Sequence, residues 1–134
     1  MEAMSYVVDT VAFVRYLQDA LPPTADKIFR AAERGEDVLF VPQIVMGEFI
    51  YLSLKNRLKV DDPAAAVKEV LRMVETSDYL RMADMDMASW EEFIELKVPE
   101  LHDRMICALA RTKNAAVITP DKDIAKSGIE VVWK

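Results

Sequence analysis

The sequence predicts an α/β domain built on a parallel β-sheet, and three observations support this. Short apolar runs alternate with segments of helical periodicity along the chain of 134 residues. The first run, residues 6–10, is rich in β-branched and aromatic residues, which is typical of a parallel strand buried on both faces. The length is that of one domain, so we expect residues 1–134 to share a single core.

Local signals place the remaining elements. Pro22 and Gly35 bound the second helix, and Asp62 followed by Pro63 is a common helix start. Helices are expected over residues 11–20, 25–34, 43–58, 64–75, 87–96 and 101–110, and further strands over residues 37–41, 79–83, 115–119 and 130–133. Asp84 and Asp86 directly precede a helix, so capping and dipole compensation are favoured over metal ligation for this pair.

Composition and charge exclude several classes of protein. The net charge of -6 argues against binding nucleic acid through a broad basic surface, although an acidic pocket neutralised by divalent cations is still allowed. With three Gly, one His and one Cys, the chain has no glycine-rich phosphate loop and no closed zinc site. The lone Cys107, a start without signal-peptide character and the lack of a membrane-spanning stretch predict a reducing, cytoplasmic setting.

Four acidic residues stand out by their positions. Asp9 and Asp121 each follow an apolar strand, Glu48 lies within an apolar helix, and Asp103 is near the start of another. Each has a structural alternative, namely a helix cap for the aspartates and a salt bridge for Glu48. In an alternating β/α chain, however, they can converge at one end of the sheet. Carboxylates without imidazole or thiolate suit Mg²⁺ or Mn²⁺, and we regard His102 as peripheral.

These motifs together resemble a known family. The strand that ends in Asp9-Thr10, the helical Glu48, the helix start at residues 101–103 and the stretch at residues 119–123 resemble the PIN-domain ribonucleases, in particular the VapC-type toxins of toxin-antitoxin pairs. The resemblance covers essentially the whole chain. It implies a three-layer α/β/α fold with a central parallel sheet.

The resemblance also implies an activity and its residues. The acidic quartet of the family falls on Asp9, Glu48, Asp103 and Asp121, which would ligate Mg²⁺ or Mn²⁺ as catalytic and metal-binding residues. Thr10, Thr119 and Asp123 fall on accessory positions. The implied reaction is metal-dependent endonucleolytic cleavage of single-stranded RNA.

The resemblance further implies partners. An antitoxin protein would suppress the activity, and a homodimer is expected, for which the apolar face of Ile50, Tyr51, Leu54 and Leu58 is a candidate contact.

Arg15, Arg104 and Lys122 are candidates for phosphate contacts, with solvated surface charge as the alternative. A catalytically silent PIN-like interaction module is the alternative function.

Two other enzyme classes fit less well. Receiver domains of response regulators carry an acidic pair after the first strand, whereas here Asp9 is followed by Thr10, and the second strand ends at Pro42. Haloacid-dehalogenase phosphatases need a second aspartate two residues after the first, and Val11 occupies that place.

Overall fold

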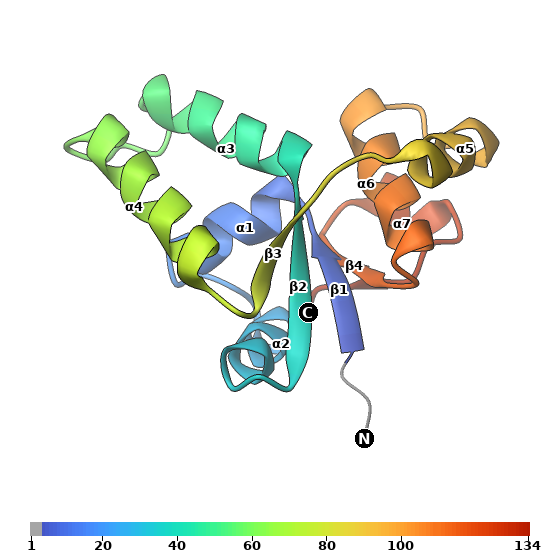
Figure 1. The fold of residues 1–134 in the computed structure, drawn as a ribbon, viewed down its shortest axis with the longest axis horizontal. Helices are drawn as coiled ribbons and strands as arrows, with labels where there is room; N and C mark the ends of the chain where they lie inside the picture. Colours follow the sequence, from blue (N-terminus) through green and yellow to red (C-terminus); the bar gives the residue numbers. More distant parts are fainter. Residues whose placement is uncertain (1–3) are drawn as a thin grey trace.

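Strand β1 (Met4–Val8) lies in the middle of a five-stranded sheet in the computed structural model, which describes residues 4–134 (Figure 1). The strand order is β3-β2-β1-β4-β5 and every pair is parallel. The other strands are β2 (Asp37–Pro42), β3 (Leu80–Ala83), β4 (Ala116–Ile118) and β5 (Val131–Val132). The first three residues, part of the stretch inspected for a signal peptide, lie outside the described residues.

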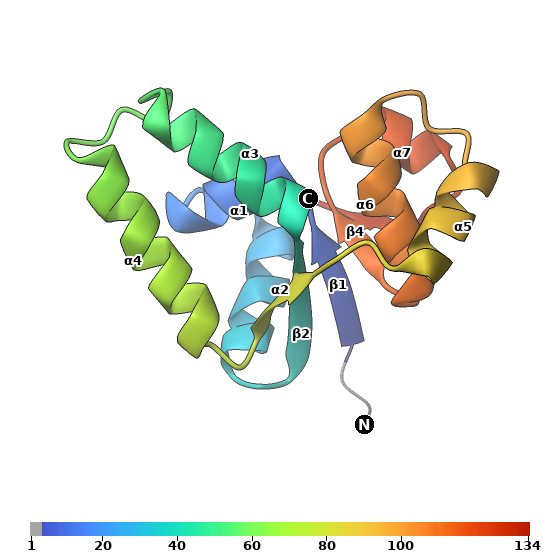
Figure 2. The same ribbon diagram turned by 45° about the horizontal axis from the view of Figure 1, so that its top comes forward.

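Helices cover both faces of this sheet. Helices α1 (Thr10–Leu17), α2 (Pro23–Glu33), α3 (Gln43–Leu54) and α4 (Pro63–Thr76) lie on one side, and α5 (Met87–Glu95), α6 (Leu101–Thr112) and α7 (Lys122–Lys126) lie on the other (Figures 1 and 2). Right-handed crossovers produce this division, because the chain first moves outward from β1 to β3 and then returns to β4 and β5. The predicted three-layer α/β/α fold is confirmed.

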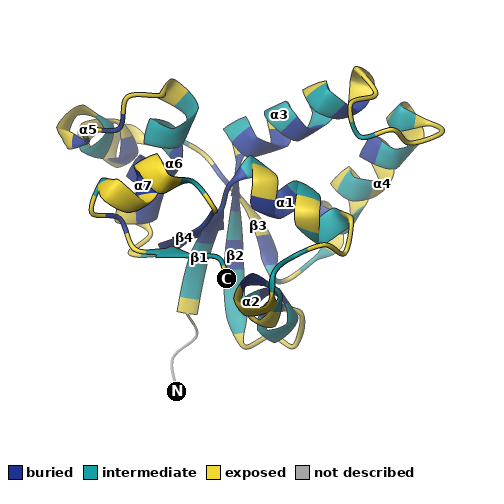
Figure 3. Cartoon of the chain, turned by 180° about the vertical axis from the view of Figure 1, so that it is seen from behind, coloured by how far each residue is buried: buried dark blue, intermediate teal, exposed yellow. Residues whose placement is uncertain are grey.

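The core lies on both faces of the central strands (Figure 3). Val7 and Val8 of β1 are fully buried, as are Val117 and Ile118 of β4, which explains why these strands are continuous apolar runs. On the α1–α4 side, Phe13 meets Phe49 edge to face with ring centroids 5.4 Å apart. The sheet therefore holds the strand ends in fixed positions.

Several element boundaries differ from expectation. The first helix ends at Leu17 rather than residue 20, and the third ends at Leu54 rather than residue 58. In both cases the second residue after the helix adopts the left-handed backbone conformation, with φ of 54° at Asp19 and 53° at Asn56, and the helix cannot continue through it. Helix α7 was not predicted at all. Within residues 4–134, no helix is long and apolar enough to span a membrane.

Candidate active site

Asp9 stands where β1 ends and α1 begins, at the carboxyl edge of the sheet. It is only 6% exposed, and its Oδ1 accepts a hydrogen bond of 2.8 Å from the backbone N–H of Ala12, so it is the N-cap of α1. Its own N–H donates to the carbonyl of Ile118 on β4, 3.3 Å away. Asp9 is thus a helix cap whose carboxylate also faces the neighbouring strand end.

Thr119 joins Asp9 to Asp121. The buried hydroxyl of Thr119 donates to Asp9 Oδ2 and accepts a hydrogen bond of 3.0 Å from the backbone N–H of Asp121. This contact follows from the sheet, because β1 and β4 are neighbours with Val8 opposite Ile118. The expected convergence of Asp9 and Asp121 at one end of the sheet therefore rests on the pairing of these two strands. Asp121 in turn caps α7 through its Oδ1.

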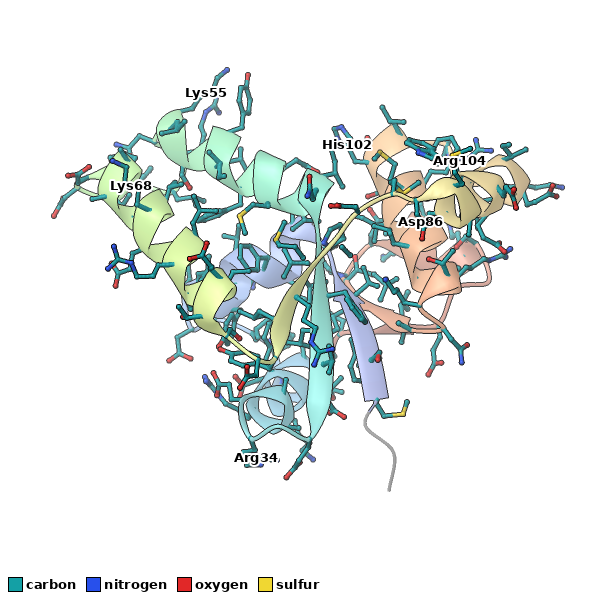
Figure 4. The ribbon with its side chains drawn as sticks, in the orientation of Figure 1. Arg34, Lys55, Lys68, Asp86, His102 and Arg104 are labelled. Carbon is teal, nitrogen blue, oxygen red and sulfur yellow. The ribbon has the colours of Figure 1, made fainter. Side chains whose placement is uncertain are left out.

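Glu48 projects from the middle of α3 and faces His102 at the start of α6. The Nδ1 atom of His102 lies 3.6 Å from Glu48 Oε1 and 3.4 Å from Glu100 Oε1. His102 extends toward α3 in Figure 4, so our interpretation of it as peripheral was wrong. Lys55, seven residues after Glu48, lies over the ring of Tyr51, 4.5 Å from its centroid, and forms no ion pair with Glu48.

Asp103 does not cap α6, contrary to the structural alternative. Glu100 is the N-cap, and its Oε2 accepts a hydrogen bond of 2.7 Å from the N–H of Asp103. The Asp103 carboxylate lies instead beside Asp121. A second residue with an unforeseen role is therefore Glu100, which both starts the helix and adds a further carboxylate.

A single cavity of about 220 Å³ brings these side chains together. Its lining includes Asp9, Thr10, Glu48, Glu100, His102, Asp103 and Asp121, so all four residues of the predicted quartet border one space. Among the described residues that line it, none is Lys or Arg. A larger cavity, of about 420 Å³, lies elsewhere, between α1, α3 and α4; apart from Glu69 its lining carries no charge, so it offers no comparable chemistry.

Crowding of carboxylates and burial change the acidity of this cavity. Burial raises the pKa of Asp9 to about 6, against hydrogen bonds from Thr119 and Ala12 that favour the charged form. Burial likewise raises the pKa of Asp103 to about 6, and the nearby charges of Asp121, Glu100 and Asp9 add to this. Without a bound cation, both carboxyl groups therefore ionise less readily than an ordinary aspartate.

The remaining predicted residues fall into two groups. Thr10 lines the cavity, and its Oγ1 is a buried oxygen without a hydrogen-bond partner in the described part of the chain. Asp123 is exposed and does not line the cavity.

The candidate phosphate-binding cations lie outside the lining. Arg104 was misassigned, because its guanidinium donates to the carbonyls of Phe93 and Ile94 and lies over the Phe93 ring near α5 (Figure 4). Arg15 and Lys122 are exposed and outside the lining too, which leaves solvated surface charge as their interpretation.

The donor set fits a hard divalent cation in its chemistry. All the acidic groups offer carboxylate oxygens, two of them have raised pKa values, and the buried Thr10 hydroxyl has no partner. Within residues 4–134, however, no three His, Cys, Asp or Glu side chains are arranged so that they could hold a metal ion as they stand. Binding therefore requires these side chains to turn toward a common point.

Comparison with known proteins identifies the family. The model of the PIN domain matches residues 6–129, nearly the whole chain. The chain belongs to the PIN domain family. The family resemblance inferred from the sequence is therefore confirmed. No curated protein matches this PIN domain in sequence.

Solved structures of toxin-antitoxin proteins share the fold of this PIN domain. VapBC2 from Rickettsia felis, bound to a DNA fragment from its promoter, has a TM-score of 0.74 at 15% identity, covering 98% of this chain and 100% of that one. VapBC-1 from nontypeable Haemophilus influenzae scores 0.67 at 16% identity (97% and 98% covered). VapC20 from Mycobacterium tuberculosis, a toxin that cleaves the sarcin-ricin loop, scores 0.63 at 22% identity (96% and 99%).

Proposed function

We propose that this PIN domain is a metal-dependent endoribonuclease that cleaves single-stranded RNA, with Asp9, Glu48, Asp103 and Asp121 as its catalytic and metal-binding residues. One observation carries the proposal: these four carboxylates, from distant parts of the chain, line one cavity together with Glu100, and among the described residues its lining has no Lys or Arg. Such a cavity repels RNA unless cations neutralise it. Mg²⁺ or Mn²⁺ suits its oxygen donors.

The residues of the cavity have distinct tasks in this proposal. Asp9, Glu48, Asp103 and Asp121 would hold a divalent ion, which would supply an acidified water and charge stabilisation at the phosphate. Thr119 fixes the orientation of Asp9 through its hydroxyl hydrogen bond, so one carboxylate oxygen has a set direction. The partnerless Thr10 hydroxyl would be available to hydrogen-bond the substrate. Asp123, one residue into α7, is an accessory acidic group outside the lining.

We further propose that the protein is the toxin of a toxin-antitoxin pair. Its fold is that of the toxin-antitoxin proteins named above, two of which are VapBC structures, and a toxin-antitoxin complex from Klebsiella pneumoniae shares it at a TM-score of 0.57. An antitoxin that places an arginine among the carboxylates would displace the metal and would also remove the repulsion between the carboxylates, because a guanidinium pairs with planar carboxylates. Such a pair would act in the cytoplasm.

A homodimer is the oligomeric state we propose. On the expected α3 face, Tyr51 and Leu54 are 59% and 60% exposed. Ile50 and Leu58 instead pack partly against the core, so half of the expected face is not available. Exposed apolar residues on α5, including Met87 and Ile94, offer further surface for this contact.

An interaction module without catalysis is the second candidate. The same exposed apolar residues favour it, since they suit protein contacts without any chemistry. The two candidates differ in what they require of the acidic cavity. Only the nuclease needs its carboxylates charged and bound to metal.

A cleavage assay separates the two candidates. Purified protein is stripped with EDTA and incubated with a panel of labelled single-stranded RNAs, with and without Mg²⁺ or Mn²⁺. We expect cleavage only with the ions, and its loss in Asp103→Asn but not in Asp61→Asn, an exposed control. Failure of the ions to restore cleavage of every RNA in the panel would favour the interaction module.

A further inference from the structure

A second cavity, of about 260 Å³, lies beside the acidic one. It is formed by the first turn of α3, by the connection from β3 to α5, and by α6. Most of its walls are apolar, with Ile44, Met85, Met105 and Leu109 among them, and two polar side chains, Gln43 and Asp84, complete the lining. The connection carries Asp86 past α6 in Figure 4, which helps to locate the cavity.

The two cavities open along the same edge of the sheet. Val7 of β1 is opposite Phe40 of β2, and Pro42 of β2 is opposite Ala83 of β3. By this register Ala83 is level with Asp9, two strands away, or roughly 10 Å at the usual strand spacing, and Asp84 lies one residue further along. This is the scale of the distance between a phosphate and the base of an adjacent nucleotide.

Two helices supply side chains to both cavities. Ile44 lines the second cavity and Glu48 the acidic one, four residues apart and so on one face of α3. On α6, Met105 and His102 are related in the same way, three residues apart. The cavities are thus neighbouring compartments rather than separate sites.

In the described part of the chain, Asp84 neither caps a helix nor pairs with another side chain, so the local structure does not explain why an aspartate is present. Its neighbour Asp86 is the N-cap of α5, with Oδ1 accepting from the N–H of Ser89 at 2.8 Å. Within residues 4–134, the side chains of Asp84 and Gln43 form no hydrogen bond or ion pair, and both are exposed. Capping, which we favoured for both aspartates, therefore holds for Asp86 alone.

We propose that the second cavity receives one unpaired base of the RNA next to the cleaved bond, and that Asp84 selects bases that present N–H donors. The proposal rests on the proposed function. A base needs apolar walls for its two faces and polar groups for its edge. Ile44 and the flexible thioethers of Met85 and Met105 provide such walls, and Gln43 and Asp84 provide the polar groups. The negative charge of Asp84 rejects a phosphate in the same place.

The chemistry of Asp84 ranks the bases. A carboxylate only accepts hydrogen bonds. Guanine presents two adjacent N–H donors on one edge, so it can meet both carboxylate oxygens. Uracil presents one N–H between two carbonyl oxygens, which the carboxylate repels. We therefore expect guanine to be preferred and uracil to be disfavoured at one position flanking the cleaved bond.

The first test maps cleavage. RNAs with each of the four bases at the positions around the cut are incubated with Mn²⁺-loaded protein, and the cut ends are sequenced. Guanine should be favoured over uracil by roughly tenfold, the scale of a bidentate base contact, and Asp84→Asn should remove this preference while cleavage continues. Asp78→Asn, at the other end of β3 and also exposed, is the matched control and should keep it. An unchanged preference in Asp84→Asn overturns the proposal.

The second test does not depend on cleavage. Protein labelled with ¹³C at the methionine methyl groups is titrated in EDTA with guanosine and uridine monophosphates. The signals of Met85 and Met105 should move with the guanosine compound and much less with uridine, while Met73, in the groove between α1, α3 and α4, stays in place.

The outcomes separate this inference from the proposed function. Signals of Met85 and Met105 that respond to neither nucleotide, or that change only with protein concentration, overturn the base site, the latter in favour of a second copy. If no RNA is cleaved at all, the proposed function fails, and the methionine signals still decide whether the cavity binds a base.

Discussion

Replacing Asp103 with Asn should stabilise the metal-free protein and abolish its activity. Asp103 does not cap α6, because Glu100 does, so the substitution leaves the helix start unchanged. The carboxyl has its pKa raised from 3.8 to about 6 by burial and by the nearby charges of Asp121, Glu100 and Asp9. At neutral pH the folded chain must therefore hold a charge that the unfolded chain holds more easily.

The size of the effect follows from this pKa. The difference corresponds to about 3 kcal/mol at neutral pH. Because Asp103 is partly exposed, solvent screens the repulsion, and we expect a gain of about 1–2 kcal/mol in the free energy of unfolding. For a domain of this size the gain raises Tm by about 3–8 °C. Cleavage should fall by at least about a hundredfold, since a neutral amide is a poor ligand for a hard cation.

The assay compares thermal unfolding in EDTA at pH 7.5 and pH 4 with the Mn²⁺-supported cleavage rate. The sign depends on pH: below pH 4 the carboxyl is protonated in both states and the variant gains nothing, and between pH 4 and about 6 the advantage appears. Asp61→Asn, exposed and outside the cavity, should change neither quantity. A less stable or fully active Asp103→Asn protein would refute the reasoning.

Three further predictions concern neighbouring groups. Thr119→Val removes the hydroxyl that bonds Asp9, so unfolding in urea should show a loss of about 1–2 kcal/mol and calorimetry a weaker affinity for Mn²⁺. Asp86→Ala, scored by the same unfolding curve, should cost about 1 kcal/mol through the lost cap, whereas Asp84→Ala should cost almost nothing. The wild-type protein in EDTA should lose stability as the pH rises from about 4 to about 6, because the raised pKa of Asp9 adds to that of Asp103; a flat pH profile of Tm would contradict this.

Much of the fold was predictable because its strands are buried on both faces. Runs such as residues 6–8 and 116–118 contain only apolar residues, and a parallel sheet with helices on both sides buries both faces of such segments. Helix ends were less predictable. Asp19 and Asn56 adopt left-handed conformations that polar residues tolerate but do not require, so the sequence alone does not mark these ends. The five-residue α7 is too short for a periodic pattern.

The candidate site was predictable in part for a similar reason. Asp9 and Asp121 follow strands, so the topology brings them together, and Glu48 is conspicuous in an apolar helix. Glu100 and His102 were missed because their proximity to Glu48 depends on how α3 and α6 face each other across the sheet edge. One signal was present: Glu100 lies three residues before Asp103, the spacing of a cap and the N–H that it accepts.

The bond between Thr119 and Asp9 joins residues that are 110 positions apart. Ribosomes add roughly 5–20 residues per second, so about 6–20 s pass between the synthesis of Asp9 and that of Thr119. During this interval β1 lacks its neighbour β4, and Asp9 and Asp121 cannot share a cavity. The order of synthesis therefore keeps the growing chain without its acidic pocket during most of translation. A nascent chain of a protein with the proposed activity therefore lacks its active site until the last part of the chain has been made.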